Sequence, residues 1–396
     1  MSIELSHRVQ AVKPSPTLAV AAKSAQLKAE GKNVVGLGTG EPDFDTPDFI
    51  KQAAIDAITR GDTKYTPVDG TPALKQAIIN KFKRDNQLDY AANEILVSCG
   101  GKQSFYNLAQ AYINPGDEVI IPAPYWVSYP DMVKLAGGVP VIIDTDYDQE
   151  LKINPEQLTQ AITDKTRLLV LNSPSNPSGK AYTKAELEAL GEVLKNHPQI
   201  LVATDDMYEH ILWTEEPFVN IVNACPFLMD RSIVLNGVSK AYAMTGWRIG
   251  YAGGPAALIA AMKKVQSQST SNPCSVSQAA AQAALDGDQT CIEPMLKAFK
   301  ARHDYVLERL NQMPGIRCLP SDGTFYAFPD CSELIKAQPE CNNDLDFAAL
   351  LLEKVGLALV PGSAFGSEGY FRISFAASDE TLKDALDRLE SVASGK

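Results

Sequence analysis

Short polar segments directly follow several apolar runs of the chain, and they hold many of the side chains that could bind a small ligand. Five occur in order: Ser98-Cys99-Gly100-Gly101-Lys102-Gln103, Pro122-Ala123-Pro124-Tyr125-Trp126, Asn172-Ser173-Pro174-Ser175-Asn176-Pro177, Thr204-Asp205-Asp206-Met207-Tyr208 and Asn236-Gly237-Val238-Ser239-Lys240. In an open parallel sheet, ligands bind beyond the carboxyl ends of the strands. The order of the segments therefore predicts one crevice on which all five converge.

The elements that must position these segments are read from the apolar runs. Seven runs have the length of buried strands: 95–97, 119–121, 139–143, 168–171, 200–202, 233–235 and 249–252. Helical stretches lie between several of them, and the stretch after Gly101 places Phe105, Leu108, Ala109, Tyr112 and Ile113 on one face. This alternation predicts an α/β fold with a largely parallel sheet covered by helices on both sides.

Two other regions flank this pattern. Thr46 and Pro47 predict the N-cap and first turn of a helix that Gly61 ends, with apolar positions at Ile50, Ala53, Ala54, Ala57 and Ile58. After about Ser275, a long helical region runs through Leu310, short strands follow near 325–328, 358–360 and 371–375, and a last helix carries Leu382, Ala385, Leu386 and Leu389. We expect an N-terminal segment (1–45) packed with a small α+β domain (286–396), and a large domain (46–285).

Several motifs resemble those of one enzyme family. They are Gly38-Thr39-Gly40-Glu41-Pro42-Asp43-Phe44, Asn176-Pro177-Ser178-Gly179, the Asp205…Tyr208 pair, Ser239-Lys240 with Gly246-Trp247-Arg248, and Arg372-Ile373-Ser374. The chain is similar from about Arg8 to its C-terminus to the fold-type I, pyridoxal-phosphate-dependent class I/II aminotransferases. It is closest to bacterial-type aspartate and glutamate/aspartate–prephenate aminotransferases. The resemblance implies a large domain with a mostly parallel, seven-stranded sheet, a smaller α+β domain, and a homodimer with shared active sites.

The resemblance also implies catalytic roles for specific residues. Lys240 would carry the cofactor as a Schiff base and move the proton of the substrate. Asp205 would pair with the pyridinium nitrogen, and Tyr208 and Asn176 would hydrogen-bond the phenolate oxygen. Asp206 stands where the related sequences more usually have Glu, and we do not expect it to touch the cofactor.

Other residues would bind the phosphate, the ring and the substrate. The phosphate would be bound by Gly101, Lys102 and Arg248, and by Tyr65 from the neighbouring subunit. Trp126 would stack on the ring, and Arg372 would hold the substrate α-carboxylate together with Gly40 and Asn176. Lys102 would read a distal carboxylate, and Lys13 matches a lysine associated with prephenate; either lysine could instead be a solvated surface charge. In the animal-type enzymes of the family, an arginine from the partner subunit binds the distal carboxylate instead. The stretch 267–272, where that arginine would be expected, contains none.

Composition sets limits on other functions. A formal net charge of −12 argues against nucleic-acid and anionic-membrane partners. The seven cysteines form no C-x-x-C pair and the four histidines no sequence cluster, so no metal site is expected. The first ten residues lack the apolar stretch of a signal peptide and no run is long enough to span a membrane, which predicts a cytoplasmic protein.

The expected reaction is amino transfer from aspartate to 2-oxoglutarate, and amination of prephenate or of aromatic 2-oxo acids is the alternative. Lyases and decarboxylases of the same fold use the same lysine and aspartate, so they stay open as a second class of enzyme. A transcription regulator built on this fold would need an additional DNA-binding domain. Because we expect the core to begin by about residue 34, we do not expect such a domain here.

Overall fold

A seven-stranded sheet forms the centre of the computed structural model, which describes residues 3–12 and 16–395. Its strand order is β2 (Ile95–Ser98), β8 (Gly250–Gly253), β7 (Ser232–Gly237), β6 (Leu201–Asp205), β5 (Thr166–Asn172), β3 (Glu118–Pro122) and β4 (Val139–Ile143). Only β8 runs antiparallel to its neighbours, β2 and β7. The expected α/β fold with a mostly parallel sheet is confirmed, and all seven apolar runs lie in its strands or begin one residue before them.

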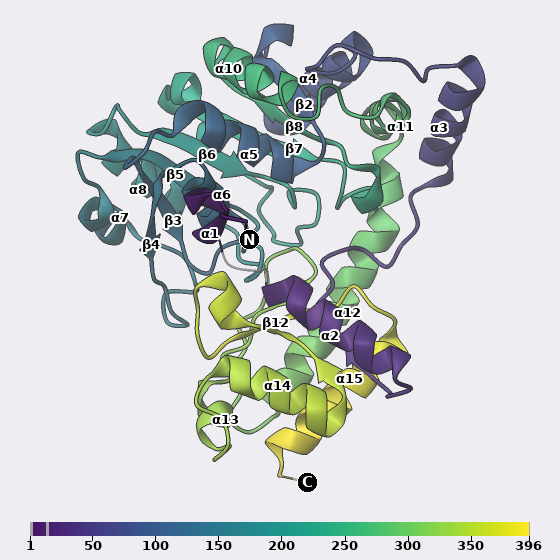
Figure 1. Ribbon diagram of the computed structural model, residues 1–396, viewed down its shortest axis with the longest axis vertical. Coiled ribbons are helices and arrows are strands. Elements are labelled where there is room, and N and C mark those ends of the chain that lie inside the picture. The colour runs from purple at the N-terminus through teal and green to yellow at the C-terminus, as the bar shows by residue number, and fades with distance from the viewer. Residues whose placement is uncertain (1–2, 13–15, 396) are drawn as a thin grey trace.

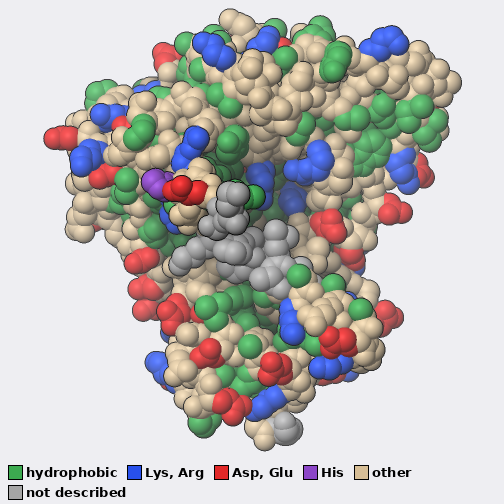
Figure 2. Space-filling view, viewed as in Figure 1, with side chains coloured by type: hydrophobic (Ala, Val, Ile, Leu, Met, Phe, Trp, Pro, Cys, Tyr) green, Lys and Arg blue, Asp and Glu red, His purple; other side chains and the backbone are tan. Residues whose placement is uncertain are grey.

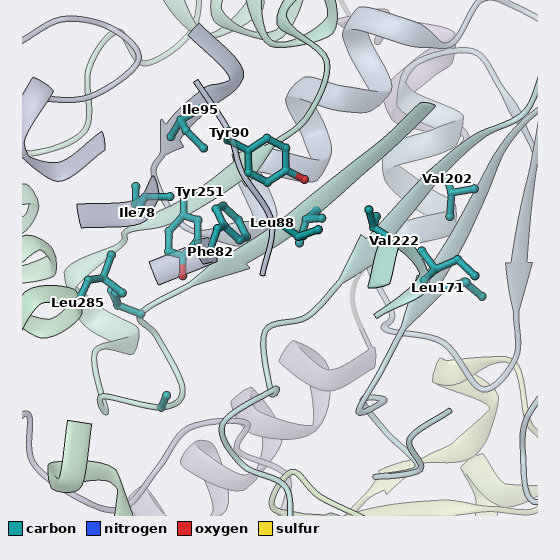
Figure 3. Packing of buried hydrophobic residues seen from close by; sticks show 14 of the residues in the cluster. Ile78, Phe82, Leu88, Tyr90, Ile95, Leu171, Val202, Val222, Tyr251 and Leu285 are labelled. Atoms are coloured by element: carbon teal, nitrogen blue, oxygen red, sulfur yellow. The ribbon is translucent and has the colours of Figure 1, made fainter. Parts of the chain in front are cut away.

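Alternate residues of these strands enter two hydrophobic cores. Leu169 and Leu171 pack on one face of the sheet, whereas Leu168 and Val170 pack on the other. The first core (Figure 3) includes residues of α3 (Asp48–Arg60), α4 (Pro72–Asn86), α8 (Lys184–Lys195), α9 (Ile221–Ala224) and α11 (Ser275–Asp286). The second includes residues of α5 (Gly101–Tyr112), α6 (Tyr129–Leu135) and α10 (Ala256–Ser267), while α7 (Pro155–Ala161) packs against α8 and β4. Strands buried on both faces explain why the runs are continuously apolar.

A third core lies below the sheet in Figure 1 and is built mainly from the last third of the chain. The elements of this part of the chain are α12 (Glu293–Asn311), β9 (Tyr326–Ala327), α13 (Ser332–Lys336), α14 (Asp344–Val355), β10 (Leu357–Ala358), β11 (Val360–Pro361), β12 (Phe371–Ser374) and α15 (Asp379–Ala393). Strands β11, β12 and β9 form an antiparallel sheet. The final helix buries Leu382, Ala385, Leu386 and Leu389, as its spacing predicts.

The N-terminal residues contact both the layers around the central sheet and the C-terminal part of the chain. Strand β1 (Val35–Gly36) pairs with β10, and α2 (Pro16–Ala29) packs near β10 and β11, whereas α1 (His7–Gln10) lies against α6. The proposed domain limits at 45/46 and 285/286 stay predictions. No helix within residues 3–12 and 16–395 is long and apolar enough to cross a membrane.

Two local expectations were wrong, and one apolar position of α3 is exposed. Pro47, not Thr46, is the N-cap of α3, because the Thr46 hydroxyl donates instead to the Ala243 carbonyl at 2.7 Å. Of the apolar positions named for α3, Ile58 is 58% exposed, because the buried face of the helix carries Ile50, Ala54 and Ala57. The expected single strand at 358–360 is two strands, since the chain leaves β10 and joins a different sheet after Leu359.

Candidate active site

The carboxyl ends of the central strands bring the polar segments together. Asn172 at the end of β5 pairs in register with Asp205 at the end of β6, and Asp205 pairs with Leu235 of β7. This edge of the sheet faces the third core, and Arg372 of β12 reaches across to Asn176. Figure 2 shows Lys and Arg side chains inside the hollow between the upper and lower parts of the molecule.

Lys240 lies three residues beyond the end of β7. Its ammonium donates to the carbonyl of Gly40, and it lies within 6 Å of the ring centroids of Tyr208 and Phe325, at 5.9 and 5.8 Å. Burial, with the positive charge of Arg372, lowers the pKa of Lys240 to about 8. This amine therefore loses its proton more readily than an ordinary lysine, as a nucleophilic lysine requires.

Asp205 ends β6, where its carboxylate accepts a hydrogen bond from the Tyr129 hydroxyl at 2.5 Å and one from the Met207 amide at 3.3 Å. Burial raises the pKa of Asp205, although the hydrogen bond from Tyr129 and the charge of Lys240 oppose this rise. A buried carboxylate in this state gains from a cation placed beside it, because the cation favours its ionised form. The position therefore suits a protonated ring nitrogen.

Arg372 is 4% exposed, and among the described residues no carboxylate forms an ion pair with it. Its Nη1 donates to Asn176 Oδ1 at 3.0 Å, its Nη2 donates to the Gly38 carbonyl at 2.7 Å, and its Nε has no partner. A buried guanidinium without a counter-ion is costly unless an anion joins it. This geometry suits a substrate carboxylate.

The turn before α5 forms a cradle with Arg248. Gly100 has a φ of 88°, and a Cβ atom at this position would lie 2.2 Å from Nη2 of Arg248, so only glycine lets the guanidinium approach the turn. Helix α5 begins at Gly101, and the first N–H groups of a helix have no partner within it. The helix N-terminus and the neighbouring cation together suit a phosphate.

The remaining predicted residues lie at the edges of this group or outside it. Lys102 Nζ lies 5.1 Å from the centroid of the Trp126 ring, and partial burial together with the charge of Arg248 lowers the pKa of Lys102. Tyr65 is 92% exposed in the loop between α3 and α4. Lys13 lies outside the described residues.

Two tyrosines at the site escaped the sequence analysis. Tyr129 donates to Asp205 and contacts the Trp126 ring edge-on at 5.2 Å between centroids. Tyr326 lies 3.1 Å from the Tyr208 hydroxyl, oxygen to oxygen, and its ring centroid lies 4.5 Å from the guanidinium carbon of Arg372. The three-residue spacing from Trp126 was a signal for Tyr129, whereas Tyr326 comes from the third core and has no such local signal.

Asp206 turns away from the cleft. Its carboxylate accepts hydrogen bonds from the Thr204 hydroxyl at 2.6 Å and the Asn220 amide at 2.9 Å, and it is fully buried. Asp206 directly follows the last residue of β6 and its N–H still donates to the Leu235 carbonyl of β7 at 2.9 Å, so the alternation of extended backbone points Asp205 and Asp206 to opposite sides.

Comparison with known proteins gives one consistent result. The family model described as aminotransferase class I and II matches residues 32–389. The chain is 61% identical to the aspartate/prephenate aminotransferase of Nitrosomonas europaea over 99% of this chain and 100% of that protein. It is 52% identical to the protein of the same name from Cereibacter sphaeroides, over 99% of each chain.

Solved structures show the same similarity. The aspartate aminotransferase from Rhizobium meliloti superposes with a TM-score of 0.96 at 48% identity, covering 99% of each chain. The aspartate aminotransferase from Thermus thermophilus, solved with maleate, gives a TM-score of 0.93 at 42% identity and covers 99% of this chain and 100% of that one.

Proposed function

This chain belongs to the class I and II aminotransferases, and from that premise we propose that it uses pyridoxal phosphate to exchange an amino group between aspartate and 2-oxoglutarate. The products are oxaloacetate and glutamate. The observation that carries this proposal is the convergence of two cations on the segment 38–40: Lys240 donates to the Gly40 carbonyl and Arg372 to the Gly38 carbonyl. One cation is an amine with a lowered pKa, and the other is a guanidinium without a counter-ion.

The residues of the cleft fit each part of the cofactor. The Lys240 amine would bind the aldehyde carbon, Asp205 would hold the ring nitrogen protonated, and the Gly100–Gly101 turn with Arg248 would hold the phosphate. Tyr208 and Asn176 would donate to the ring oxygen, and Trp126 would cover a ring face. When bound, pyridoxal phosphate supplies an electron-accepting ring that stabilises negative charge on the substrate Cα.

The protein's own groups would perform the remaining steps. Arg372 would bind the α-carboxylate through its fork of N–H donors, and this fixes the Cα near Lys240. Once displaced from the cofactor, the Lys240 amine would take the Cα proton and return it to the carbon on the cofactor side. Gly40 is required at this place, because a Cβ atom there would lie 2.7 Å from the Tyr326 hydroxyl.

Aspartate as the amino donor is supported by the names of the relatives and by the cation at the mouth of the cleft. Lys102 lies beside Trp126 and can meet a distal carboxylate. The Thermus thermophilus relative was solved with maleate, which is a dicarboxylate. Prephenate is the second acceptor we propose, since two of the relatives are named for it. A role for Lys13 in accepting prephenate stays a prediction, as does a cytoplasmic location.

We also propose that the active unit is a homodimer. Tyr65 is 92% exposed in the single chain, and in a dimer it could bind the cofactor phosphate in the site of the second copy. Helix α3, which precedes the Tyr65 loop, exposes Phe49, Ile55 and Ile58. Exposed apolar side chains on one helix beside the loop are typical of a surface that a partner covers.

The proposed reaction is tested by mixing the purified, cofactor-loaded protein with aspartate and 2-oxoglutarate and following oxaloacetate. We expect turnover by the wild-type protein and none by Lys240→Ala, which retains the fold. Repeated turnover by Lys240→Ala without an added amine would contradict the assignment of Lys240.

A further inference from the structure

A buried polar cluster lies behind the site, on the side of the sheet that packs against α4. We call Lys81, Asn86, Glu209 and Asn236 the Glu209 cluster. The side chains of Lys81 and Glu209 form an ion pair and are only 1% and 3% exposed. Glu209 also accepts hydrogen bonds from the amides of Asn86 and Asn236, both at 2.7 Å, and Asn86 accepts one from Lys81 at 2.7 Å.

These contacts join the two segments that carry the proposed catalytic residues. Glu209 follows Tyr208 directly, and its backbone N–H donates to the Asp206 carbonyl at 3.0 Å in the turn after β6. Asn236 lies at the end of β7, four residues before Lys240, and its side chain also accepts from the Gly237 N–H at 2.7 Å. Helix α4 supplies the other two members. A single carboxylate therefore links the Tyr208 turn, the strand that leads to Lys240, and a helix that packs on both.

Stability alone gives no reason for this arrangement. Burying an ion pair costs desolvation energy, and apolar residues of similar volume often stabilise a protein as well or better. Hydrogen bonds to a buried carboxylate are directional, so a fully satisfied cluster holds the joined segments in one register. Although burial alone would raise the pKa of Glu209, Lys81 and His210 hold it below its ordinary value, so the carboxylate stays ionised.

We propose that Glu209 is a positioning residue for the amino-transfer reaction: its carboxylate fixes the Tyr208 hydroxyl relative to the Lys240 amine. The inference rests on the proposed function, because it assigns the purpose of the cluster to the geometry of Tyr208 and Lys240 around the cofactor. Neither Glu209 nor Lys81 touches the cleft. The effect is transmitted through one peptide unit to Tyr208 and through the end of β7 to Lys240.

The charged groups that face the cluster agree with this role. His210 Nε2 lies 3.5 Å from Glu209 and 3.4 Å from Asp85, and Asp85 is paired with Arg84. Asp85, Glu209 and His210 could in principle hold a metal ion. The oxygens of Glu209 are already occupied by Lys81, Asn86 and Asn236, which leaves the carboxylate to serve the protein's own donors. Burial, with the charge of Glu209, raises the pKa of Asp206 to about 7.

The test compares two paired substitutions in the cofactor-loaded protein. Lys81→Met with Glu209→Met removes the cluster without leaving a lone buried charge. Lys81→Met with Glu209→Gln keeps an oxygen that can accept from Asn236. The main readout is the pH midpoint of the visible absorbance of the bound cofactor. A Tyr208 hydroxyl held at the oxygen of the cofactor ring would lower the pKa of the Lys240 nitrogen attached to the cofactor, and this pKa sets the midpoint. We expect the Met pair to fold, to raise this midpoint by about one pH unit, and to lower kcat about tenfold or more with little change in KM. The Gln pair should recover part of both losses.

Lys152→Met with Glu186→Gln is the matched control. This pair is also an ion pair of a largely buried lysine, but it joins the segment before α7 to α8 and shares no hydrogen bond or ion pair with the Glu209 cluster, and Gln preserves the cap of α8. The control should leave the midpoint and kcat unchanged. If the Met pair does not fold, Asn236→Leu removes the link to β7 alone and should shift the midpoint in the same direction.

A folded Met pair, or a folded Asn236→Leu variant, with a wild-type absorbance midpoint and wild-type kcat would overturn the positioning role. That result differs from failure of the proposed function. If the proposed function is wrong, the wild-type protein itself shows no amino transfer.

Discussion

At the scale of single residues, the site depends on ionisable groups whose charged forms are disfavoured by burial. Lys240 is driven towards its neutral form, Asp205 towards its protonated form, and Arg372 lacks an anion. A cofactor with a positively charged ring nitrogen would pair with Asp205, and a substrate carboxylate would pair with Arg372. The unpaired groups of the cleft are therefore matched to the charges of the ligands we propose.

Tyr129→Phe tests this matching at Asp205. The change removes the hydroxyl that donates to Asp205 and keeps the ring beside Trp126. The pKa of Asp205 should rise further, so the carboxylate becomes protonated at a higher pH as the pH falls. Affinity of the cofactor-free protein for pyridoxal phosphate should be about tenfold lower at mildly acidic pH and nearer to wild type at alkaline pH. Titrations at several pH values measure this, and equal affinities throughout would show that Tyr129 does not act on Asp205.

Lys102→Ala tests whether the Lys102 ammonium binds the distal carboxylate of the substrate. We expect kcat/KM for aspartate and glutamate to fall by an amount equivalent to about 1.5–3 kcal/mol, the worth of a charged hydrogen bond. Aromatic amino acids should lose much less, because they offer no anion to this ammonium. Steady-state kinetics with both substrate classes decide the point. Equal losses on the two classes would mean that Lys102 contributes only its backbone, at the phosphate.

At the scale of elements, the sheet could be predicted because its strands are buried on both faces and therefore appear as continuous apolar runs. The beginning of α3 could not, because the Thr46 hydroxyl is used by Ala243, almost 200 positions away in the sequence. The same limit applies to Leu359, where a strand pattern continues while the chain passes from one sheet to another. Local pattern predicts an element; tertiary partners decide where it ends.

Gly100→Ala tests the turn that begins α5. Gly100 and Gly116 both have a φ of 88°, so alanine strains the backbone at either position. A Cβ atom at Gly100 also meets the Arg248 guanidinium, whereas one at Gly116 meets nothing within 4 Å. Both variants should lose stability, Gly100→Ala by about 1–3 kcal/mol because its ψ of 160° is open almost only to glycine, but only Gly100→Ala should lose affinity for pyridoxal phosphate. Thermal unfolding and cofactor titration separate the two effects. Equal cofactor affinity in the two variants would refute the cradle.

At the scale of the whole molecule, the cleft is assembled from bodies that are distant in sequence. The five polar segments converge because they end neighbouring strands, and this could be foreseen. Tyr326 could not be foreseen, because it lies in the antiparallel sheet of the third core, which Tyr208 joins from the turn after β6. A contact between residues 118 positions apart has no signature in either local pattern.

Sharing of active sites between two chains is tested with mixed dimers. We expect Tyr65→Ala and Lys240→Ala each to be impaired alone. If Tyr65 reaches the partner's site, each mixed dimer regains one intact site, so an equal mixture should recover about a quarter of wild-type sites. Activity after co-refolding measures this. No recovery would mean that Tyr65 serves its own chain, and a fully active monomer would exclude a shared site.

The most direct test of the central claim follows the amino nitrogen itself. The purified protein, loaded with pyridoxal phosphate, is given aspartate that carries a heavy nitrogen isotope together with unlabelled 2-oxoglutarate. Mass spectrometry should find the heavy nitrogen in glutamate, in equal amount to the oxaloacetate formed, and nothing beyond background with Lys240→Ala. Heavy nitrogen released as ammonia, or an aspartate-derived product other than oxaloacetate, would contradict amino transfer and indicate a lyase instead.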